Sequence, residues 1–292
     1  MTIIETHQVV DSANHEASVN RSKKSSRSYA VLAAVMRDMP GLSLEGVAEH
    51  AKLQTRVDTK YLVTPEQFLA ALEHVRDELN VLDIDGQRIF GYESVYFDTA
   101  ALQTFRDHRQ GKRHRFKVRT RLYENSGDCM LEVKVKDPRG QTVKHRKPYD
   151  AKQRGKLTAE GISFIDQVLR EEYGFEAPDL EPALLSAYSR GTFVDIADAS
   201  RITCDVGLAW DRGRDRVSGP DALLVETKSA DGFGSFDQAL RAERIRPVKI
   251  SKYAVGTALL HPHLAANKWN RVLRHDFGWV RDEVPMPSEG AA

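Results

Sequence analysis

The sequence has few cysteines and no long hydrophobic run. Its 292 residues include two cysteines, Cys129 and Cys204, which stand far apart, without CxxC spacing or companion histidines. This pattern indicates two buried thiols in a reducing compartment rather than a disulfide or a metal site. The longest apolar stretch, Tyr29 to Met36, is much shorter than the roughly 20 residues of a membrane-spanning helix. We therefore expect a soluble, cytoplasmic protein.

Several common phosphate-binding and catalytic motifs are also missing. The sequence contains no G-x-x-x-x-G-K-[ST] loop, no G-x-G-x-x-G, no H-E-x-x-H and no kinase H-R-D set. These absences disfavour P-loop, dinucleotide-binding, zinc-protease and kinase folds. The formal net charge is only +1, so a preference for an anionic partner has to come from the arrangement of charges along the chain.

Segments of alternating hydrophobic and polar residues, typical of strands, dominate the chain after residue 55. They cover residues 55–63, 94–99, 115–123, 130–137, 141–149, 183–195, 201–212 and 222–230. The turn 137–140 predicts a hairpin, and helices are expected over 64–75, 162–174 and 250–262. This order predicts an α+β fold in which an antiparallel sheet curls into a β-barrel with helices packed outside.

The same patterns divide the chain into three parts. Residues 1–28 have too little apolar surface to fold and are expected to form a disordered leader. Residues 29–262 are expected to form one domain that opens with two short helices in 29–51. Residues 263–292 form a C-terminal tail, which we expect to dock partly through Trp269 and Trp279.

Positive charge is concentrated in one part of the chain. The stretch RFKVRTR places Arg115, Lys117, Arg119 and Arg121 on one strand face, and Phe116 points to the other face. Between residues 112 and 147, the sequence contains twelve Lys or Arg and only four Asp or Glu. Like charges on neighbouring strands repel one another unless an anion compensates them. The pattern predicts a polyanion-binding face rather than a solvated surface.

Carboxylates recur beside cations in this and later strands. Glu132 stands two residues before Lys134, and Glu226 two residues before Lys228. A cross-strand ion pair would explain either pair by itself. Together with the basic strands, they suit a site in which cations hold phosphate oxygens and a carboxylate holds Mg²⁺ or Mn²⁺. The nearby histidines, His108, His114 and His145, lack metal-ligand spacing and are expected to be phosphate contacts or surface residues.

These segments occur in an order that resembles a known family. RVDTKYLV, VYFDT, RFKVRTRLY, LEVKVKD, YSR, RITCD, VETK and KISKY are similar to motifs of the VTC domain, the polyphosphate polymerase domain of the vacuolar transporter chaperone complex. That domain belongs to the triphosphate tunnel metalloenzymes. The resemblance implies a tunnel of antiparallel strands with a basic interior and outer helices. Eukaryotic members also carry an inositol-phosphate sensor domain and membrane helices, neither of which this sequence shows, so it resembles the stand-alone bacterial form.

The resemblance also implies roles for individual residues. The catalytic phosphate-gripping residues would be Lys60, Arg119, Arg121, Lys134, Arg190, Arg201 and Lys252. Further phosphate-binding residues would be Arg115, Lys117, Lys144, Arg146, Lys228 and Lys249, of which Arg115 and Lys117 are placed least firmly. Glu226, helped by Glu132, would hold the Mn²⁺ or Mg²⁺ cofactor, and the role of Asp205 is open.

The activity implied is a polyphosphate polymerase that transfers the γ-phosphate of ATP to a growing inorganic polyphosphate chain and releases ADP. One alternative is a triphosphate hydrolase of the same superfamily, although the first strand reads R-V-D-T-K rather than E-x-E-x-K. Another is a non-enzymatic polyphosphate-binding module. Nucleic acid is not expected, because only Tyr123 shares the cationic face of its strand. A membrane protein supplied by another chain, holding this one at the inner face of the membrane, is a further hypothesis.

Overall fold

The computed structural model describes residues 26–50, 57–137 and 139–280. Most of the expected leader lies outside this range, but helix α2 (Arg27–Arg37) already begins two residues before the expected domain boundary. Ser26 caps this helix by accepting a hydrogen bond from the Tyr29 amide. Both cysteines are free and buried, as predicted. Within the described ranges, no helix has the length and apolar character needed to cross a bilayer.

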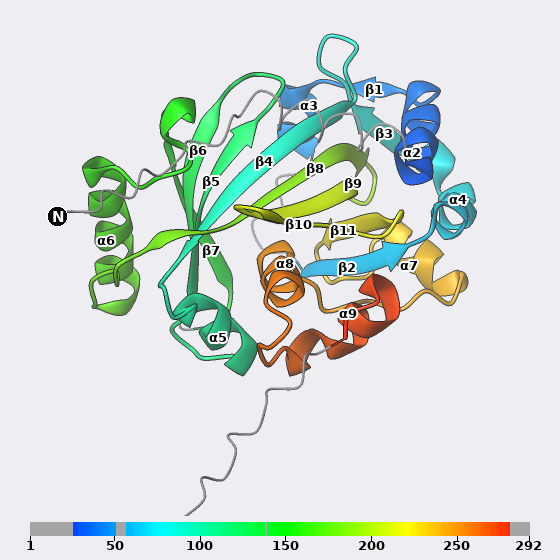
Figure 1. Ribbon diagram of the computed structural model, residues 1–292. Coiled ribbons are helices and arrows are strands. Elements are labelled where there is room, and N and C mark those ends of the chain that lie inside the picture. The colour runs from blue at the N-terminus through cyan, green and yellow to red at the C-terminus, as the bar shows by residue number, and fades with distance from the viewer. Residues whose placement is uncertain (1–25, 51–56, 138, 281–292) are drawn as a thin grey trace, which may run out of the picture.

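One curled antiparallel sheet organises the molecule (Figure 1). Its strand order is β2-β11-β9-β8-β4-β5-β6-β7. The bounds are β2 Val57–Val63, β4 Ile89–Asp98, β5 Phe116–Tyr123, β6 Cys129–Lys136, β7 Thr142–Pro148, β8 Glu181–Asp195, β9 Ser200–Arg212 and β11 Leu223–Ser229. In the described part of the chain, β2 and β7 end this path without pairing with each other, so the sheet forms a half-barrel. The predicted α+β barrel fold is confirmed in this form.

Three short strands extend the sheet at its margins. β1 (Gly41–Leu42) pairs in parallel with β3 (Leu79–Leu82), and β3 pairs with β8. β10 (Asp215–Ser218) forms a hairpin with β9. β3 pairs with β8 just beyond the start of β4. The short helix α3 (Leu44–His50) packs at this margin, where Val47 and Leu82 belong to the same small core.

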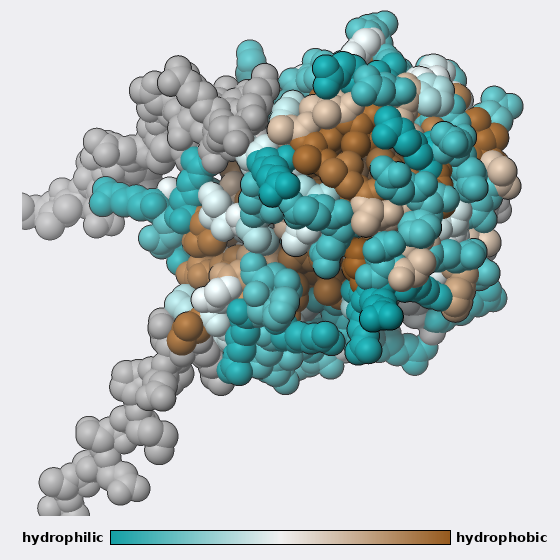
Figure 2. Space-filling model, turned by 90° about the vertical axis from the view of Figure 1, so that its right-hand side faces the viewer, coloured by the Kyte–Doolittle hydropathy of each residue, from teal (hydrophilic) through white to brown (hydrophobic). Residues whose placement is uncertain are grey.

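Two groups of helices cover the convex face of the sheet. On one side are α2, α4 (Pro65–Glu73) and α7 (Ser235–Ala242), and on the other is α6 (Ala159–Tyr173). The first group packs on the alternate side chains of β2, β9 and β11, and α6 packs on those of β5 and β6. The face shown in Figure 2, which lies on the right in Figure 1, is largely hydrophilic, with its largest hydrophobic area in the upper middle of the view and smaller ones elsewhere. Successive side chains of a strand point to opposite faces of the sheet, and one set packs under the apolar sides of these helices. The other set therefore points to the concave face.

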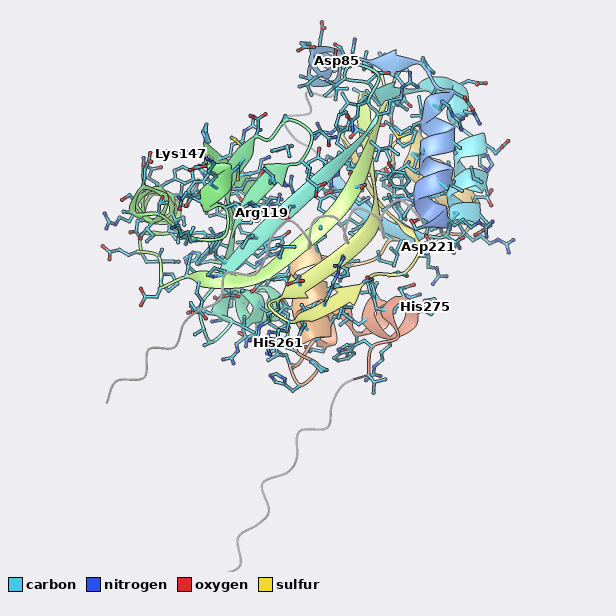
Figure 3. All side chains as sticks on the ribbon, turned by 45° about the horizontal axis from the view of Figure 1, so that its top comes forward. Asp85, Arg119, Lys147, Asp221, His261 and His275 are labelled. Atoms are coloured by element: carbon cyan, nitrogen blue, oxygen red, sulfur yellow. The ribbon has the colours of Figure 1, made fainter. Side chains whose placement is uncertain are left out.

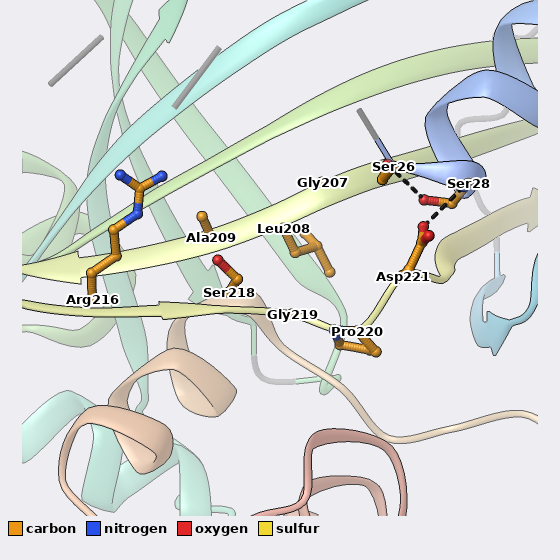
Figure 4. Close-up of a pocket in the computed structure, with 10 residues that line it drawn as sticks. All are labelled: Ser26, Ser28, Gly207, Leu208, Ala209, Arg216, Ser218, Gly219, Pro220 and Asp221. Atoms are coloured by element: carbon orange, nitrogen blue, oxygen red, sulfur yellow. Dashed lines mark hydrogen bonds between the residues drawn. The ribbon is translucent and has the colours of Figure 1, made fainter. Parts of the chain in front are cut away.

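Local capping fixes where the outer helices begin. Thr64 and Gln67 form a capping box at the start of α4, within the predicted helix 64–75. At the start of α2, the Asp221 carboxylate accepts hydrogen bonds from the amides of Arg27 and Ser28, at 2.9 Å each. These groups border a small depression of about 90 Å³ (Figure 4). Because Asp221 already accepts hydrogen bonds from these amides, the depression, which Leu208 of β9 also lines, is part of the capping of α2.

A second set of helices lies on the concave side. α8 (Lys252–Leu260) sits inside the curl of the sheet, with α5 (Gln103–Gln110) and α9 (Asn270–Phe277) beside it (Figure 1). The short 3₁₀ helices are η1 Arg76–Glu78, η2 Ala151–Gln153 and η3 Asn267–Trp269. α8 packs against Tyr96, Tyr188 and Leu224 of the strands, and Trp269 is buried in the same cluster. One end of the concave face is therefore filled by apolar packing.

The closeness of α8 to the sheet depends on Gly256. A Cβ at this position would lie 2.2 Å from Cδ1 of the Trp210 ring. Alanine normally favours a helix over glycine, but here we expect Gly256→Ala to lower the free energy of unfolding by about 1–3 kcal/mol through overpacking. Chemical denaturation measures this. The control is Gly155→Ala, which meets no atom within 4 Å and should change stability by less than about 0.5 kcal/mol. Equal effects would contradict the packing described here.

Candidate active site

The strand registers gather most of the predicted site residues on the concave face. Arg119 of β5 stands opposite Tyr96 of β4 and Glu132 of β6, and Glu132 stands opposite Arg146 of β7. In the next row, Lys117 of β5, Lys134 of β6 and Lys144 of β7 stand side by side. Arg119 lies near the middle of the sheet (Figure 3). The alternation read from RFKVRTR therefore directs Lys117, Arg119 and Arg121 to one surface.

Arg119 and Glu132 form a buried ion pair at the centre of this surface. Arg119 Nε donates to Glu132 Oε2 at 2.7 Å, and Arg119 Nη1 donates to the Tyr96 hydroxyl at 3.1 Å. Lys144 Nζ lies 3.5 Å from Glu132 Oε1. Burial would raise the pKa of Glu132, but Arg119, followed by Arg121 and Lys144, lowers it below its usual value. Glu132 is therefore an anion that holds Arg119 in a fixed orientation.

A second ion-pair centre forms around Asp205 of β9. Arg190 of β8 donates to both carboxylate oxygens of Asp205, at 2.6 and 2.8 Å, and Lys252 of α8 contacts Oδ2. Lys252 Nζ also lies 4.3 Å from the centre of the Tyr188 ring. Burial alone would raise the pKa of Asp205, and the two cations lower it. Asp205, whose role the sequence left open, therefore orients Arg190 and Lys252.

Glu226 of β11 is the centre of a third group. Its Oε1 atom contacts Lys60 Nζ of β2 at 2.9 Å and Lys228 Nζ at 2.7 Å. Lys228 also lies 3.6 Å from Asp58 Oδ2. Burial opposes ionisation, but Lys228 and Lys60 bring the pKa of Glu226 well below its ordinary value. The Glu226 side chain is 19% exposed, so it is the most accessible of these three central carboxylates.

Arg121 and Lys134 lack such partners. Among the residues that the structure describes, neither side chain makes a hydrogen bond or an ion pair, and Arg121 Nε is buried without an acceptor. The guanidinium of Arg121 lies 5.5 Å from the centre of the Tyr92 ring. Repulsion from Arg119, then burial, then repulsion from Arg121 bring the pKa of Lys134 well below its ordinary value. Glu132 and Glu226 offset this repulsion only in part, so the two cations add to a concentration of positive charge.

The remaining predicted cations differ in position. Arg201 stands opposite Lys228 in the sheet. Arg146 and Lys144 are exposed on the edge strand β7. Arg115 precedes β5 and donates to the carbonyls of Gly111 and Lys112, away from the three ion-pair centres. Lys249 is exposed in the segment before α8. Arg115 and Lys249 are therefore the predicted residues least associated with the concave site.

The carboxylates fit a divalent metal ion only in a limited way. Within the described ranges, no three His, Cys, Asp or Glu side chains cluster closely enough to hold a metal. Mg²⁺, however, often binds through one or two carboxylates together with phosphate oxygens. Glu226 fits this role because it is partly exposed. Glu132 fits it poorly, since its side chain has no exposed surface and Arg119 occupies it.

Aromatic residues contribute to the site in a way that sequence reasoning missed. Tyr92 and Tyr188 stack with ring centres 5.3 Å apart, and Arg190 lies 5.4 Å from both rings. Tyr96 accepts a hydrogen bond from Arg119. The spacing of Tyr92, Ser94 and Tyr96 at every second position of β4 is the sequence signal that could have placed these rings on the concave face. These rings pack beneath the arginines, so they help to orient them.

Comparison with solved structures finds distant similarity. HpAC1 of Hippeastrum, reported to have a dominant triphosphatase activity, is 14% identical, with coverage of 70% of this chain and 96% of its own and a TM-score of 0.42. The PH1819 protein of Pyrococcus horikoshii OT3 is 13% identical, with coverage of 66% and 92% and a TM-score of 0.36. No curated protein matches the sequence.

The sequence itself gives a clearer result. The VTC domain matches residues 55–261, a span that runs from the start of β2 to the end of α8 and includes all three ion-pair centres. The match therefore covers most of the chain and all the charged strands of the concave face. On this basis, the chain belongs to the VTC domain family.

Proposed function

We propose that the concave face catalyses metal-dependent transfer of the γ-phosphate of ATP to a growing inorganic polyphosphate chain, with release of ADP. The observation that carries this proposal is the presence of Arg121 and Lys134, which make no hydrogen bond or ion pair within the described residues, on the same face as three compensated ion-pair centres. Unpaired buried charges are costly to a fold. A phosphate anion that binds between them would supply the missing negative charge.

The paired cations suit the positioning that phosphoryl transfer requires. This reaction depends mainly on in-line alignment and on neutralisation of charge that spreads over the phosphate oxygens. Arg119 and Arg190 are already oriented by Glu132 and Asp205, so they would lose little freedom when they bind phosphate. Lys60, Arg201 and Lys252 would contribute further positive charge. A divalent ion held by Glu226 would neutralise charge on the triphosphate oxygens.

The distribution of cations supports a polymeric acceptor. Positive side chains continue from the central Arg119 to Lys144 and Arg146 on the exposed edge strand β7. Lys134 and Lys144 stand opposite each other and extend the row begun by Lys117. A chain of phosphates can follow such a row without sequence-specific contacts.

The test is an assay of the products. Purified protein is incubated with ATP and Mn²⁺ or Mg²⁺, polyphosphate is resolved on a gel, and ADP and free phosphate are quantified. We expect long polyphosphate chains, with ADP released in proportion to the phosphate incorporated. Free phosphate without chains would replace the proposal with a triphosphate hydrolase. Absence of turnover, together with retained binding of polyphosphate, would instead indicate a non-enzymatic binding module.

A further inference from the structure

Lys117 has an environment unlike that of the other cations on the concave face. Its Nζ atom lies 3.1 Å from His108 Nε2 and 3.2 Å from Ser251 Oγ. His108 belongs to α5, and Ser251 caps the N-terminus of α8. Lys117 therefore stands at the end of the concave face that α5 and α8 cover. Both of its hydrogen-bond partners can be neutral, so neither is a counter-ion.

The charged groups around Lys117 are predominantly positive. Arg119 of β5 and Arg115, which immediately precedes this strand, flank it in the sequence, and Lys134 of β6 stands directly opposite. The other elements packed around it contribute Lys60 of β2, Lys252 of α8 and Lys268 of η3. The central carboxylates Glu132, Asp205 and Glu226 are each paired with other cations. Burial first, and then repulsion from Lys268, Arg119, Lys60 and Arg115, lowers the pKa of Lys117 to about 7.

His108 is a hydrogen-bond partner of Lys117 and not a second positive charge beside it. Its ring stacks on Trp269, with ring centres 5.4 Å apart. Its backbone carbonyl accepts a hydrogen bond from Lys268 Nζ at 2.8 Å. Burial, followed by the positive charge of Lys117, brings the pKa of His108 far below its usual value. The neutral ring can accept a hydrogen bond from the Lys117 ammonium and fix its direction.

We propose that Lys117 forms a proton-linked phosphate subsite at the α8 end of the concave face, and that His108 is the positioning residue of this subsite. When a phosphate group binds to the neutral form of Lys117, Nζ takes up one proton from solvent, and the resulting ammonium pairs with a phosphate oxygen. No covalent bond forms or breaks. The inference rests on the proposed function because it assumes that phosphate chains occupy this face.

The direction of the pH dependence follows from proton linkage. Below about pH 7, Lys117 already carries its proton, so binding needs no further proton at this residue. Above that pH, the free protein has lost the proton and must regain it on binding. Affinity should then fall by up to about tenfold per pH unit because of this one group. The subsite would therefore favour phosphate at neutral to slightly acidic pH.

The experiment measures binding of inorganic tripolyphosphate to the full chain by calorimetry, in metal-free buffer from about pH 6 to pH 9. Ionisation of the ligand affects every variant equally, so differences between variants report the protein. Wild-type protein should lose affinity as the pH rises. Lys117→Met should bind more weakly at low pH and lose the part of the pH dependence due to Lys117. Lys117→Arg should retain affinity and also lose the pH dependence due to Lys117, because arginine stays protonated.

His108→Glu separates positioning from a purely structural role. A carboxylate beside Lys117 would stabilise its ammonium, so the fall in affinity should move to higher pH. A general loss of folding would weaken binding at every pH without moving this transition. The matched control is Lys152→Met, which removes an exposed lysine outside the concave face and should follow the wild-type curve.

Two results would overturn different parts of this account. If Lys117→Met and Lys117→Arg bind tripolyphosphate with the same pH dependence as the wild type, Lys117 is not the linked group and the inference is wrong. If the wild-type protein fails to bind tripolyphosphate even at low pH, the phosphate-binding face in the proposed function is wrong as well.

Discussion

Replacing Arg121 with methionine should lower the rate of ATP turnover by about 100-fold or more, because loss of one preorganised donor to a developing anionic oxygen has an effect of this size. In the free protein, this guanidinium is buried and Nε has no acceptor. Its hydrogen-bonding capacity is therefore available for phosphate. Steady-state release of ADP with saturating ATP and metal measures the change.

The same substitution should not destabilise the protein. An unpaired buried charge opposes folding, so an apolar side chain of similar length is expected to keep or raise the free energy of unfolding. Lys152→Met provides the control for removal of a positive charge from an exposed position. If Arg121→Met unfolds the protein, or leaves turnover within about twofold of the wild-type rate, Arg121 is not a phosphate-binding residue reserved for substrate.

The second large effect is expected for Glu226→Gln, which should reduce metal-dependent turnover by about 100-fold or more. Glutamine retains the shape of the side chain but removes the charge that would hold a divalent ion. Metal-free binding of tripolyphosphate should persist or become tighter, because Lys60 and Lys228 would lose the carboxylate that pairs with them. Turnover as a function of Mn²⁺ concentration, combined with metal-free calorimetry, measures both parts.

A matched carboxylate on the outer surface controls for the loss of negative charge. Glu160 pairs with Lys147 on an exposed surface, and Glu160→Gln should leave turnover and metal dependence unchanged. Near-normal activity of Glu226→Gln would remove Glu226 from the metal site. Loss of both turnover and tripolyphosphate binding would show that Glu226 orders the lysines instead of binding metal.

Strand alternation predicted much of the fold and the direction of the main side chains. RFKVRTR separates Phe116 and Val118, which pack under α6, from Arg119 and Arg121, which line the concave face. A period of two is a local property of the backbone, so a short sequence is enough to reveal it. The capping box at Thr64 and helix α8, which begins after Ser251, follow from equally local signals.

Long-range pairing determined what the sequence could not show. The separation of paired Arg119 from unpaired Arg121 depends on which strand lies beside β5 and in which register. The role of Asp205 depends on β8 and α8, which approach it from distant parts of the chain. Helices α5, α7 and α9 were not predicted, although α5 carries His108. Their polar residues form networks that only the assembled fold brings together.

The central claim concerns where the phosphate groups bind, and a crystal structure of the protein with tripolyphosphate and Mn²⁺ tests it most directly. We expect phosphate oxygens within hydrogen-bond distance of Arg121 and Lys134, with the Arg119–Glu132 pair intact and the metal ion bound through Glu226 and phosphate oxygens. Tripolyphosphate bound only outside the concave face, with Arg121 and Lys134 still without an anion, would contradict the account.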